Sequence, residues 1–198
     1  MLVVERMVRN PVTVPVTASV GEALAVMAGQ QIHHLPVVDA GGGLVGIVSE
    51  KDLLRARPAE PVAGAMSAAV VTVTEYTALE EAARIMVDQR VSSLPVLRGG
   101  RLVGIITETD LFQLFLELLG AREAGVRLTL LIPEEKGMLA AVTHEISSLG
   151  GNILALGTFL GEDPTNRLVT VKVAGVAREK LVAIMEALGT EVVDARES

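Results

Sequence analysis

The sequence contains no cysteine and no tryptophan, and its aromatic residues are limited to 3 phenylalanines and 1 tyrosine. The absence of cysteine excludes a disulfide scaffold, thiol catalysis and cysteine-ligated zinc. So few aromatic residues cannot form a platform on which several nucleic-acid bases stack. We therefore expect an aliphatic core in this chain of 198 residues, of which 50% are hydrophobic.

Positive charge is also scarce. The 17 lysines and arginines are outnumbered by 24 aspartates and glutamates, and the formal net charge is −7. Without a basic cluster, the chain is expected to bind neither nucleic acid nor a membrane surface by neutralising phosphates. No apolar run approaches the length of a membrane span, and the opening "MLVVERMVRN" lacks the core of a signal peptide. We therefore expect a cytoplasmic protein whose partners are small molecules or other proteins.

What the sequence does contain is an internal repeat. Residues 7–54 align with residues 66–112 once one residue is deleted in a glycine turn. In each copy the pattern predicts a strand, a helix, a hairpin of two strands closed by the glycine turn, and a second helix. The alignment indicates a duplicated unit.

The pattern changes after the second copy. From about Val126 the predicted order is strand, helix, strand, strand, helix, strand, which is the ferredoxin-like split βαβ arrangement. We therefore predict an α+β chain in which each repeat forms a small three-stranded sheet with two helices. The predicted segments are a first repeat over 1–57, a connector over 58–64, a second repeat over 65–120, a linker over 121–125 and a ferredoxin-like βαββαβ domain over 126–198.

Each repeat carries the same short polar motif at the end of its last strand. A hydroxyl residue, Ser49 or Thr107, is followed three positions later by Asp52 or Asp110. One interpretation is a helix start, with the hydroxyl as N-cap and the carboxylate in the first turn. The other is a nucleotide site, because free backbone N–H groups and the hydroxyl bind phosphate while the carboxylate accepts hydrogen bonds from a ribose diol.

The repeats resemble CBS domains over residues 7 to 115, because "LPVV", the glycine turn, "LVGI" and a G-h-x-[ST]-x-x-D motif occur in order, twice. The motif residues are Gly46, Ser49, Asp52 and Gly104, Thr107, Asp110. The resemblance implies that paired CBS domains bind an adenine nucleotide as a regulatory ligand. The implied contacts are ribose at Asp52 and Asp110, phosphate at Ser49, Thr107, Lys51 and His34, and adenine at Thr13, Val14, Ile32, Pro36, Thr72, Val73, Val91 and Pro95.

The two clefts are not expected to be equal. The first repeat has three nitrogen-bearing side chains where the second has hydroxyls: His33, His34 and Lys51 against Ser92, Ser93 and Thr109. This difference predicts that the first cleft favours a more highly charged phosphate tail.

A metal site and a catalytic centre are not expected. Adjacent positions such as His33 and His34 point to opposite faces of an extended segment. The segment at His144 begins like a zinc-protease motif but has Ser148 where the second histidine must lie. With three histidines and no cysteine, no nucleophile–base arrangement can be identified.

The C-terminal segment resembles an ACT domain, a module that commonly binds amino acids, through its βαββαβ order, "PEEKGML" and "GGNIL". The implied effector loop comprises Glu134, Lys136, Gly137, Met138, Leu139, Asn152 and Ile153. Glu134 and Lys136 stand where that family often has Asp and Pro. The alternative interpretation is structural, with Gly137 as a loop glycine of positive φ and Asn152 as a turn residue.

A CBS pair followed by an ACT domain is similar to the acetoin-utilisation protein family. We expect a non-enzymatic sensor that needs no cofactor, binds AMP, ADP, ATP or an adenosyl compound in its CBS pair, and uses its ACT domain for a second effector such as an amino acid, or for assembly. The apolar segment "LFQLFLELLG" predicts a homodimer, and a regulated target protein is implied. The main alternative is a dimerising scaffold that binds no nucleotide. An enzyme of acetoin breakdown would need a catalytic, thiamine or lipoyl site, and we find none of these in the sequence.

Overall fold

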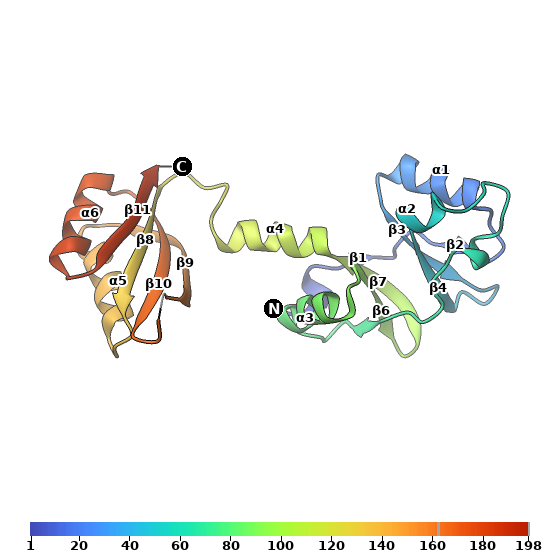
Figure 1. Cartoon of the computed structure of the whole chain (residues 1–198), viewed down its shortest axis with the longest axis horizontal. Helices are drawn as coiled ribbons and strands as arrows, with labels where there is room; N and C mark the ends of the chain where they lie inside the picture. Colours follow the sequence, from blue (N-terminus) through green and yellow to red (C-terminus); the bar gives the residue numbers. More distant parts are fainter. Residues whose placement is uncertain (162, 198) are drawn as a thin grey trace. The chain divides into compact units, whose positions relative to one another are not determined.

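A computed structural model describes residues 1–161 and 163–197 of the chain (Figure 1). It divides into two compact units, Met1–Phe112 and Gln113–Ser198. The first unit holds the two repeats up to Phe112, and the second unit holds the remainder of the chain, with the βαββαβ segment. Within the described residues, we find no helix with the length and apolar character needed to span a membrane.

The first repeat folds around a three-stranded sheet with the order β2-β3-β4. Strand β2 is parallel to β3, and β3 and β4 form an antiparallel hairpin. Helix α1 begins after a capping box, in which Ser19 accepts a hydrogen bond from the Glu22 amide while the Glu22 carboxylate accepts from the Ser19 amide. The elements are β2 (Val14–Pro15), α1 (Val20–Gln30), β3 (His34–Val38), β4 (Leu44–Ser49) and the single-turn helix α2 (Glu50–Leu53).

The second repeat has a four-stranded sheet, with the order β1-β7-β6-β5. The prediction of three strands is therefore wrong for this repeat. The additional strand β1 precedes the first repeat in the chain but pairs with β7, with Val8 opposite Ile105. The elements are β1 (Val8–Arg9), β5 (Val73–Thr74), α3 (Leu79–Gln89), β6 (Ser93–Arg98), β7 (Arg101–Thr107) and α4 (Glu108–Leu118).

The segment that precedes each repeat packs on the other repeat. At the start of the chain, the Val3 amide in η1 (Val3–Glu5) donates to the Thr77 carbonyl at 2.9 Å. In the segment predicted as a connector, the Val62 amide in η2 (Val62–Gly64) donates to the Ala18 carbonyl at 2.8 Å, and the Val62 side chain is fully buried in the first repeat's core. The two repeats are therefore tied together by exchanged segments, which an alignment of two similar copies does not reveal. The segment boundaries of 1–57, 58–64 and 65–120 remain a prediction.

The second unit confirms the predicted βαββαβ order and has a fully antiparallel sheet, β11-β8-β10-β9. Alternate residues of β8 are buried, and they pack against apolar side chains of α5 and α6 such as Ile146 and Leu181. The elements are β8 (Val126–Pro133), α5 (Met138–Ser148), β9 (Asn152–Leu160), β10 (Asn166–Ala174), α6 (Arg178–Ala187) and β11 (Glu191–Glu197).

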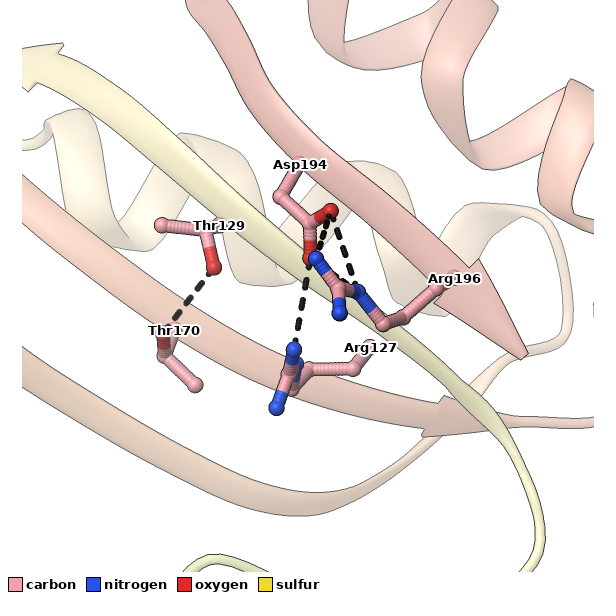
Figure 2. Close-up of polar contacts among 5 residues, drawn as sticks. All are labelled: Arg127, Thr129, Thr170, Asp194 and Arg196. Carbon is pink, nitrogen blue, oxygen red and sulfur yellow. Dashed lines mark hydrogen bonds and ion pairs between the residues drawn. The ribbon is translucent and has the colours of Figure 1, made fainter. Parts of the chain in front are cut away.

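The other face of this sheet carries polar side chains over the first half of β8, at Arg127 and Thr129, whereas Leu131 and Pro133 follow on the same face (Figure 2). The Asp194 carboxylate accepts hydrogen bonds from Arg196 at 2.6 Å and from Arg127 at 3.4 Å. Hydrogen bonds from Arg196, and to a lesser extent from Arg127, lower the pKa of Asp194. Thr129 and Thr170 share a hydrogen bond of 3.3 Å across the neighbouring strands. The alternation of β8 thus separates the aliphatic core face from a second face, whose Arg127 and Thr129 form hydrogen bonds.

Candidate functional site

The hydroxyl–aspartate motif forms the same capping box in both repeats. In the first, the Ser49 amide and hydroxyl donate to Asp52 Oδ2 at 3.0 and 2.5 Å, and the Asp52 amide donates to Ser49 Oγ at 3.2 Å. In the second, the corresponding distances between Thr107 and Asp110 are 2.8, 2.7 and 3.3 Å. The helix-start interpretation of the motif is therefore confirmed.

The capping box leaves half of each carboxylate available. All the hydrogen bonds that Asp52 and Asp110 accept within the described residues go to Oδ2, so Oδ1 of each has no partner there. Both aspartates also line clefts of the first unit. The cap thus fixes the orientation of a carboxylate that keeps one oxygen for a ligand, and the two interpretations of the motif are compatible.

We call the first cavity the Asp52 cleft; its volume is about 290 Å³. The motif side comes from the first repeat, and the opposite wall comes from the second repeat. Its lining residues are His34, Ile47, Ser49, Asp52, Ser67, Ala69, Val70, Val71, Arg90, Val91, Ser92 and Ser93.

The second cavity, the Asp110 cleft, has a volume of about 320 Å³ and the reverse composition. Its motif side comes from the second repeat, and its opposite wall comes from the first. Its lining residues are Val8, Pro11, Val12, Gln31, Ile32, His33, His34, Pro36, Ser92, Ile105, Thr107, Glu108, Thr109 and Asp110. The duplication therefore produces two related clefts to which both repeats contribute.

Two residues belong to both clefts. His34 Nε2 and the Ser92 hydroxyl lie 2.8 Å apart and share a hydrogen bond whose direction depends on the imidazole tautomer. Burial of the imidazole, and then the neighbouring His33, lower the pKa of His34, while Asp52 and Glu108 oppose the shift. The imidazole is therefore held toward its neutral form, in which one ring nitrogen donates and the other accepts.

Three of the four predicted phosphate contacts line a cleft, and Lys51 does not. Ser49 lines the Asp52 cleft, Thr107 lines the Asp110 cleft, and His34 lines both. Lys51 is exposed on α2 and lines neither cleft. His33, expected at the first repeat's cleft, lines the Asp110 cleft, because each wall is supplied by the other repeat.

Arg90 lines the Asp52 cleft although it was not among the predicted site residues. It is the C-cap of α3 and adopts a left-handed conformation with φ 55°. Its counterpart in the first repeat is Gln31, also a left-handed C-cap, with φ 54°. The signal available in the sequence was this Gln–Arg difference between the two copies.

Three of the eight predicted adenine contacts line a cleft, and the other five do not. Ile32 and Pro36 line the Asp110 cleft, and Val91 lines the Asp52 cleft. Val14 and Val73 are instead buried, because β2 and β5 turn these side chains into the cores of their repeats. Three further predicted residues, Thr13, Thr72 and Pro95, do not line either cleft. The apolar walls come from residues just before these strands: Pro11, Val12, Val70 and Val71.

The second unit has a cavity of about 240 Å³ beside the predicted effector loop. Glu134, Met138 and Leu139 line it, and the Arg167 guanidinium forms an ion pair with Glu134 at its edge. The predicted loop residues that do not line it are Lys136, Gly137, Asn152 and Ile153. Gly137 precedes α5 with φ 96°, which agrees with its structural interpretation.

Residues 1–161 and 163–197 contain no group of three or more histidine or acidic side chains suited to hold a metal ion. The two adjacent histidines instead contact different partners. His33 Nδ1 lies 2.7 Å from Glu50 Oε2, whereas His34 contacts Ser92.

Comparisons with known proteins match the repeat region. A family model described as CBS domain matches residues 3–59 and again residues 62–117. A CBS domain-containing protein of Dictyostelium discoideum is 31% identical over 136 residues, which cover 60% of this chain and 94% of that protein. Homoserine O-acetyltransferase of Methanocorpusculum labreanum is 34% identical over 114 residues, but these cover only 23% of that enzyme.

Solved structures match the same region. The AcuB protein of Vibrio cholerae, whose name refers to acetoin utilization, has a TM-score of 0.57 and 34% identity, covering 62% of this chain and 96% of that one. The CBS domain pair of protein MJ0100, in complex with 5′-methylthioadenosine and S-adenosyl-L-methionine, has a TM-score of 0.57 and 30% identity, covering 62% and 98%. CBSX2 in complex with AMP has a TM-score of 0.53 and 29% identity, covering 58% and 96%.

Proposed function

The chain belongs to the CBS domain family, and we propose that its two repeats form a regulatory sensor for adenine nucleotides or related adenosyl compounds. The observation that carries this proposal is the pair of clefts, each with an aspartate held by a capping box and one carboxylate oxygen left without a partner among the described residues. Related CBS pairs have been crystallised with AMP, 5′-methylthioadenosine and S-adenosylmethionine.

The cleft chemistry suits an adenosine. The free carboxylate oxygen accepts a hydrogen bond from the ribose diol, and the capping hydroxyl lies beside it. Apolar side chains such as Val12 in the Asp110 cleft and Val71 in the Asp52 cleft offer a wall for the purine. Arg90 supplies a forked donor for phosphate oxygens in the Asp52 cleft.

Ligand-dependent unfolding tests the proposal. At about one hundred times its dissociation constant, a ligand adds about 2.7 kcal/mol of stability, which raises the unfolding midpoint by several degrees. We expect this rise with at least one of AMP, ADP, ATP and S-adenosylmethionine. It should disappear in the Asp52→Asn/Asp110→Asn double variant, because each asparagine has a single acceptor oxygen and the capping box uses it.

Glu22→Gln provides a matched control, because Glu22 belongs to a capping box at the start of α1 and lines neither cleft. It should change intrinsic stability without changing the response to ligand. No midpoint rise with any of the four compounds would favour the alternative function, a dimerising scaffold in which the aspartates are only caps.

In this proposal the protein acts by regulation rather than by catalysis. Nucleotide binding must favour one packing of the two repeats over another, because a ligand shifts an equilibrium only by its differential affinity for the two states. A target protein in the cytoplasm would then respond to the favoured arrangement. The link to acetoin utilisation rests on the name of the AcuB relative and on the family resemblance.

For the second unit we propose an ACT-like role in binding a second effector. The cavity beside Glu134 and Arg167 places a carboxylate and a guanidinium together, which matches the two charges of a free amino acid. Heteronuclear NMR titration with the common amino acids would test this, with Arg167→Gln as the variant expected to lose the response. Absence of shifts near Met138 with every amino acid would leave assembly as the role of this unit.

We also propose that the chain forms a homodimer. Helix α4 leaves large apolar side chains exposed, including Phe112 at 66% and Phe115 at 51% of full exposure, and such side chains are favourable in a subunit interface. Multi-angle light scattering should give twice the mass of the 20.8 kDa chain. A monomer at micromolar concentration would contradict this proposal.

A further inference from the structure

The two clefts differ most clearly at one pair of equivalent positions. Gln31 and Arg90 end helices α1 and α3 with nearly the same left-handed backbone, at φ 54° and ψ 43° against φ 55° and ψ 44°. Each side chain lines the cleft whose motif belongs to the other repeat. The duplicated fold therefore places an amide in the Asp110 cleft where it places a guanidinium in the Asp52 cleft.

The Asp52 cleft is suited to an anionic substituent. Its charged lining groups are one carboxylate, Asp52, and one guanidinium, Arg90, and its other polar lining includes the hydroxyls of Ser49 and Ser67. A guanidinium binds phosphate oxygens through two parallel hydrogen bonds. The single-turn helix α2 is too short to supply this attraction by its dipole, so Arg90 is the main source of positive charge.

The charged residues of the Asp110 cleft are mainly negative. Its lining includes two carboxylates, Glu108 and Asp110, and two imidazoles, His33 and His34, but no lysine or arginine. Burial lowers the pKa of His34, and His33 faces the Glu50 carboxylate at 2.7 Å, so neither imidazole offsets the two carboxylates. The Glu108 side chain forms no hydrogen bond or ion pair with the part of the chain that the structure describes, whereas its equivalent Glu50 is held by His33 at 2.7 Å. The start of α4 adds a partial charge of about +0.5, which two carboxylates more than offset.

Building on the proposed nucleotide function, we propose that the two clefts divide adenosine compounds by the charge of their 5′ substituent. The Asp52 cleft binds adenosine 5′-phosphates through Arg90. The Asp110 cleft binds adenosyl compounds with a neutral thioether or a cationic sulfonium at the 5′ position. A phosphate there would face Glu108 without a cation to compensate, whereas a sulfonium would be attracted to it.

Calorimetric titration of the full chain separates the two sites. ATP should bind with one site per chain, and this site should be lost in Asp52→Asn and kept in Asp110→Asn. S-Adenosylmethionine should also bind with one high-affinity site, lost in Asp110→Asn and kept in Asp52→Asn. 5′-Methylthioadenosine should follow S-adenosylmethionine.

Substitutions that exchange Gln31 and Arg90 test whether the guanidinium determines which cleft binds phosphate. Arg90→Gln should weaken ATP binding by tenfold or more, because a charge-assisted contact of this kind is worth at least one factor of ten. Its effect on S-adenosylmethionine should be less than twofold. Gln31→Arg should create a second ATP site and weaken S-adenosylmethionine, and the matched left-handed backbone at both positions keeps the exchange free of new strain.

These experiments distinguish failure of the ligand division from failure of adenosine binding itself. Equal binding of ATP to both clefts of the wild type, or loss of ATP binding in Asp110→Asn alone, would overturn the division of ligands while supporting the adenosine-binding function. Failure of ATP, 5′-methylthioadenosine and S-adenosylmethionine to bind the wild type would overturn the adenosine-binding function and, with it, the division.

Discussion

His34 Nε2 lies 2.8 Å from the hydroxyl of Ser92, and this hydrogen bond joins the two repeats at the point where their clefts meet. The two residues are not equivalent in the duplication, since Ser92 aligns with His33 and Ser93 aligns with His34. The contact is therefore an asymmetric feature in a fold of two similar halves. Because the hydrogen-bonded pair lines both clefts, a change in its position in one cleft also changes the other.

The first prediction concerns pH. Burial and the nearby His33 lower the pKa of His34 in the folded protein, against the opposing effect of Asp52 and Glu108. An unfolded histidine has a pKa of about 6.5. The unfolded chain therefore binds more protons below that pH, and the free energy of unfolding should fall as pH drops from about 6.5 toward the lowered pKa of His34.

The His34→Gln variant should show a weaker loss of stability in this window, measured by urea unfolding at several pH values. His144→Gln is the control, because His144 lies in the second unit, on α5, and lines neither cleft. An unchanged pH profile in His34→Gln would show that other groups account for the acid sensitivity.

The second prediction concerns coupling between the clefts. Because His34 and Ser92 line both clefts and share a hydrogen bond, a ligand that moves this pair in one cleft should change the shape of the other. We therefore expect the affinity for ATP to depend on S-adenosylmethionine, and reciprocally by the same factor. Ser92→Ala should bring this factor close to one. Ser67→Ala is the matched control, since Ser67 lines the Asp52 cleft only. Calorimetric titration of one ligand in the presence of the other measures the factor, and coupling that persists in Ser92→Ala would rule out this route.

The third prediction separates capping from binding. Ser19 and Ser49 both cap helices through the same reciprocal box, and loss of an N-cap hydroxyl typically costs about 1 kcal/mol. Ser19→Ala and Ser49→Ala should therefore lower the free energy of unfolding by similar amounts. Only Ser49→Ala should also weaken ATP binding, because only Ser49 lines a cleft. Equal nucleotide affinity in the two variants would reduce the Ser49 hydroxyl to a structural cap.

Local patterns in the sequence predicted the elements well. The repeated periodicity located α1 and α3, and the glycine turns located the hairpins β3-β4 and β6-β7. The motif aspartates were placed correctly at helix starts, because a capping box depends on residues three apart. The βαββαβ order of the second unit followed from the same kind of signal.

Relations between distant segments could not be predicted in this way. Val8 pairs with Ile105 and Ser67 pairs with Ile47 because each lead-in segment crosses to the other repeat. Two similar copies present similar partners, so the alignment alone does not choose between them. Each cleft also takes its opposite wall from the other repeat, so His33 lines the Asp110 cleft and Arg90 lines the Asp52 cleft. Arg90 thus takes the place of Lys51 as the source of positive charge, and the expectation that the Asp52 cleft favours phosphate is unchanged.

The final prediction follows from this exchange and explains the glycine that begins the motif. A Cβ on Gly46 would overlap the Met66 side chain, with 2.9 Å to Met66 Cγ, since Met66 belongs to the segment that crosses from the second repeat. Gly46→Ala should therefore lower the free energy of unfolding by about 1–3 kcal/mol, as overpacking of a tight interior does. Gly29→Ala is the control: Gly29 lies in α1 with nothing within 4 Å of its added Cβ, and alanine there should stabilise the helix by up to about 1 kcal/mol.

The Gly46→Ala/Met66→Ala double variant identifies the source of the strain. Met66→Ala removes the side chain that an added Cβ would meet, so Gly46→Ala should cost less in the Met66→Ala background than in the wild type. Urea unfolding of the two single variants and the double variant gives this interaction energy. Equal costs in the two backgrounds would mean that Gly46 is required for a reason other than close packing against the exchanged segment.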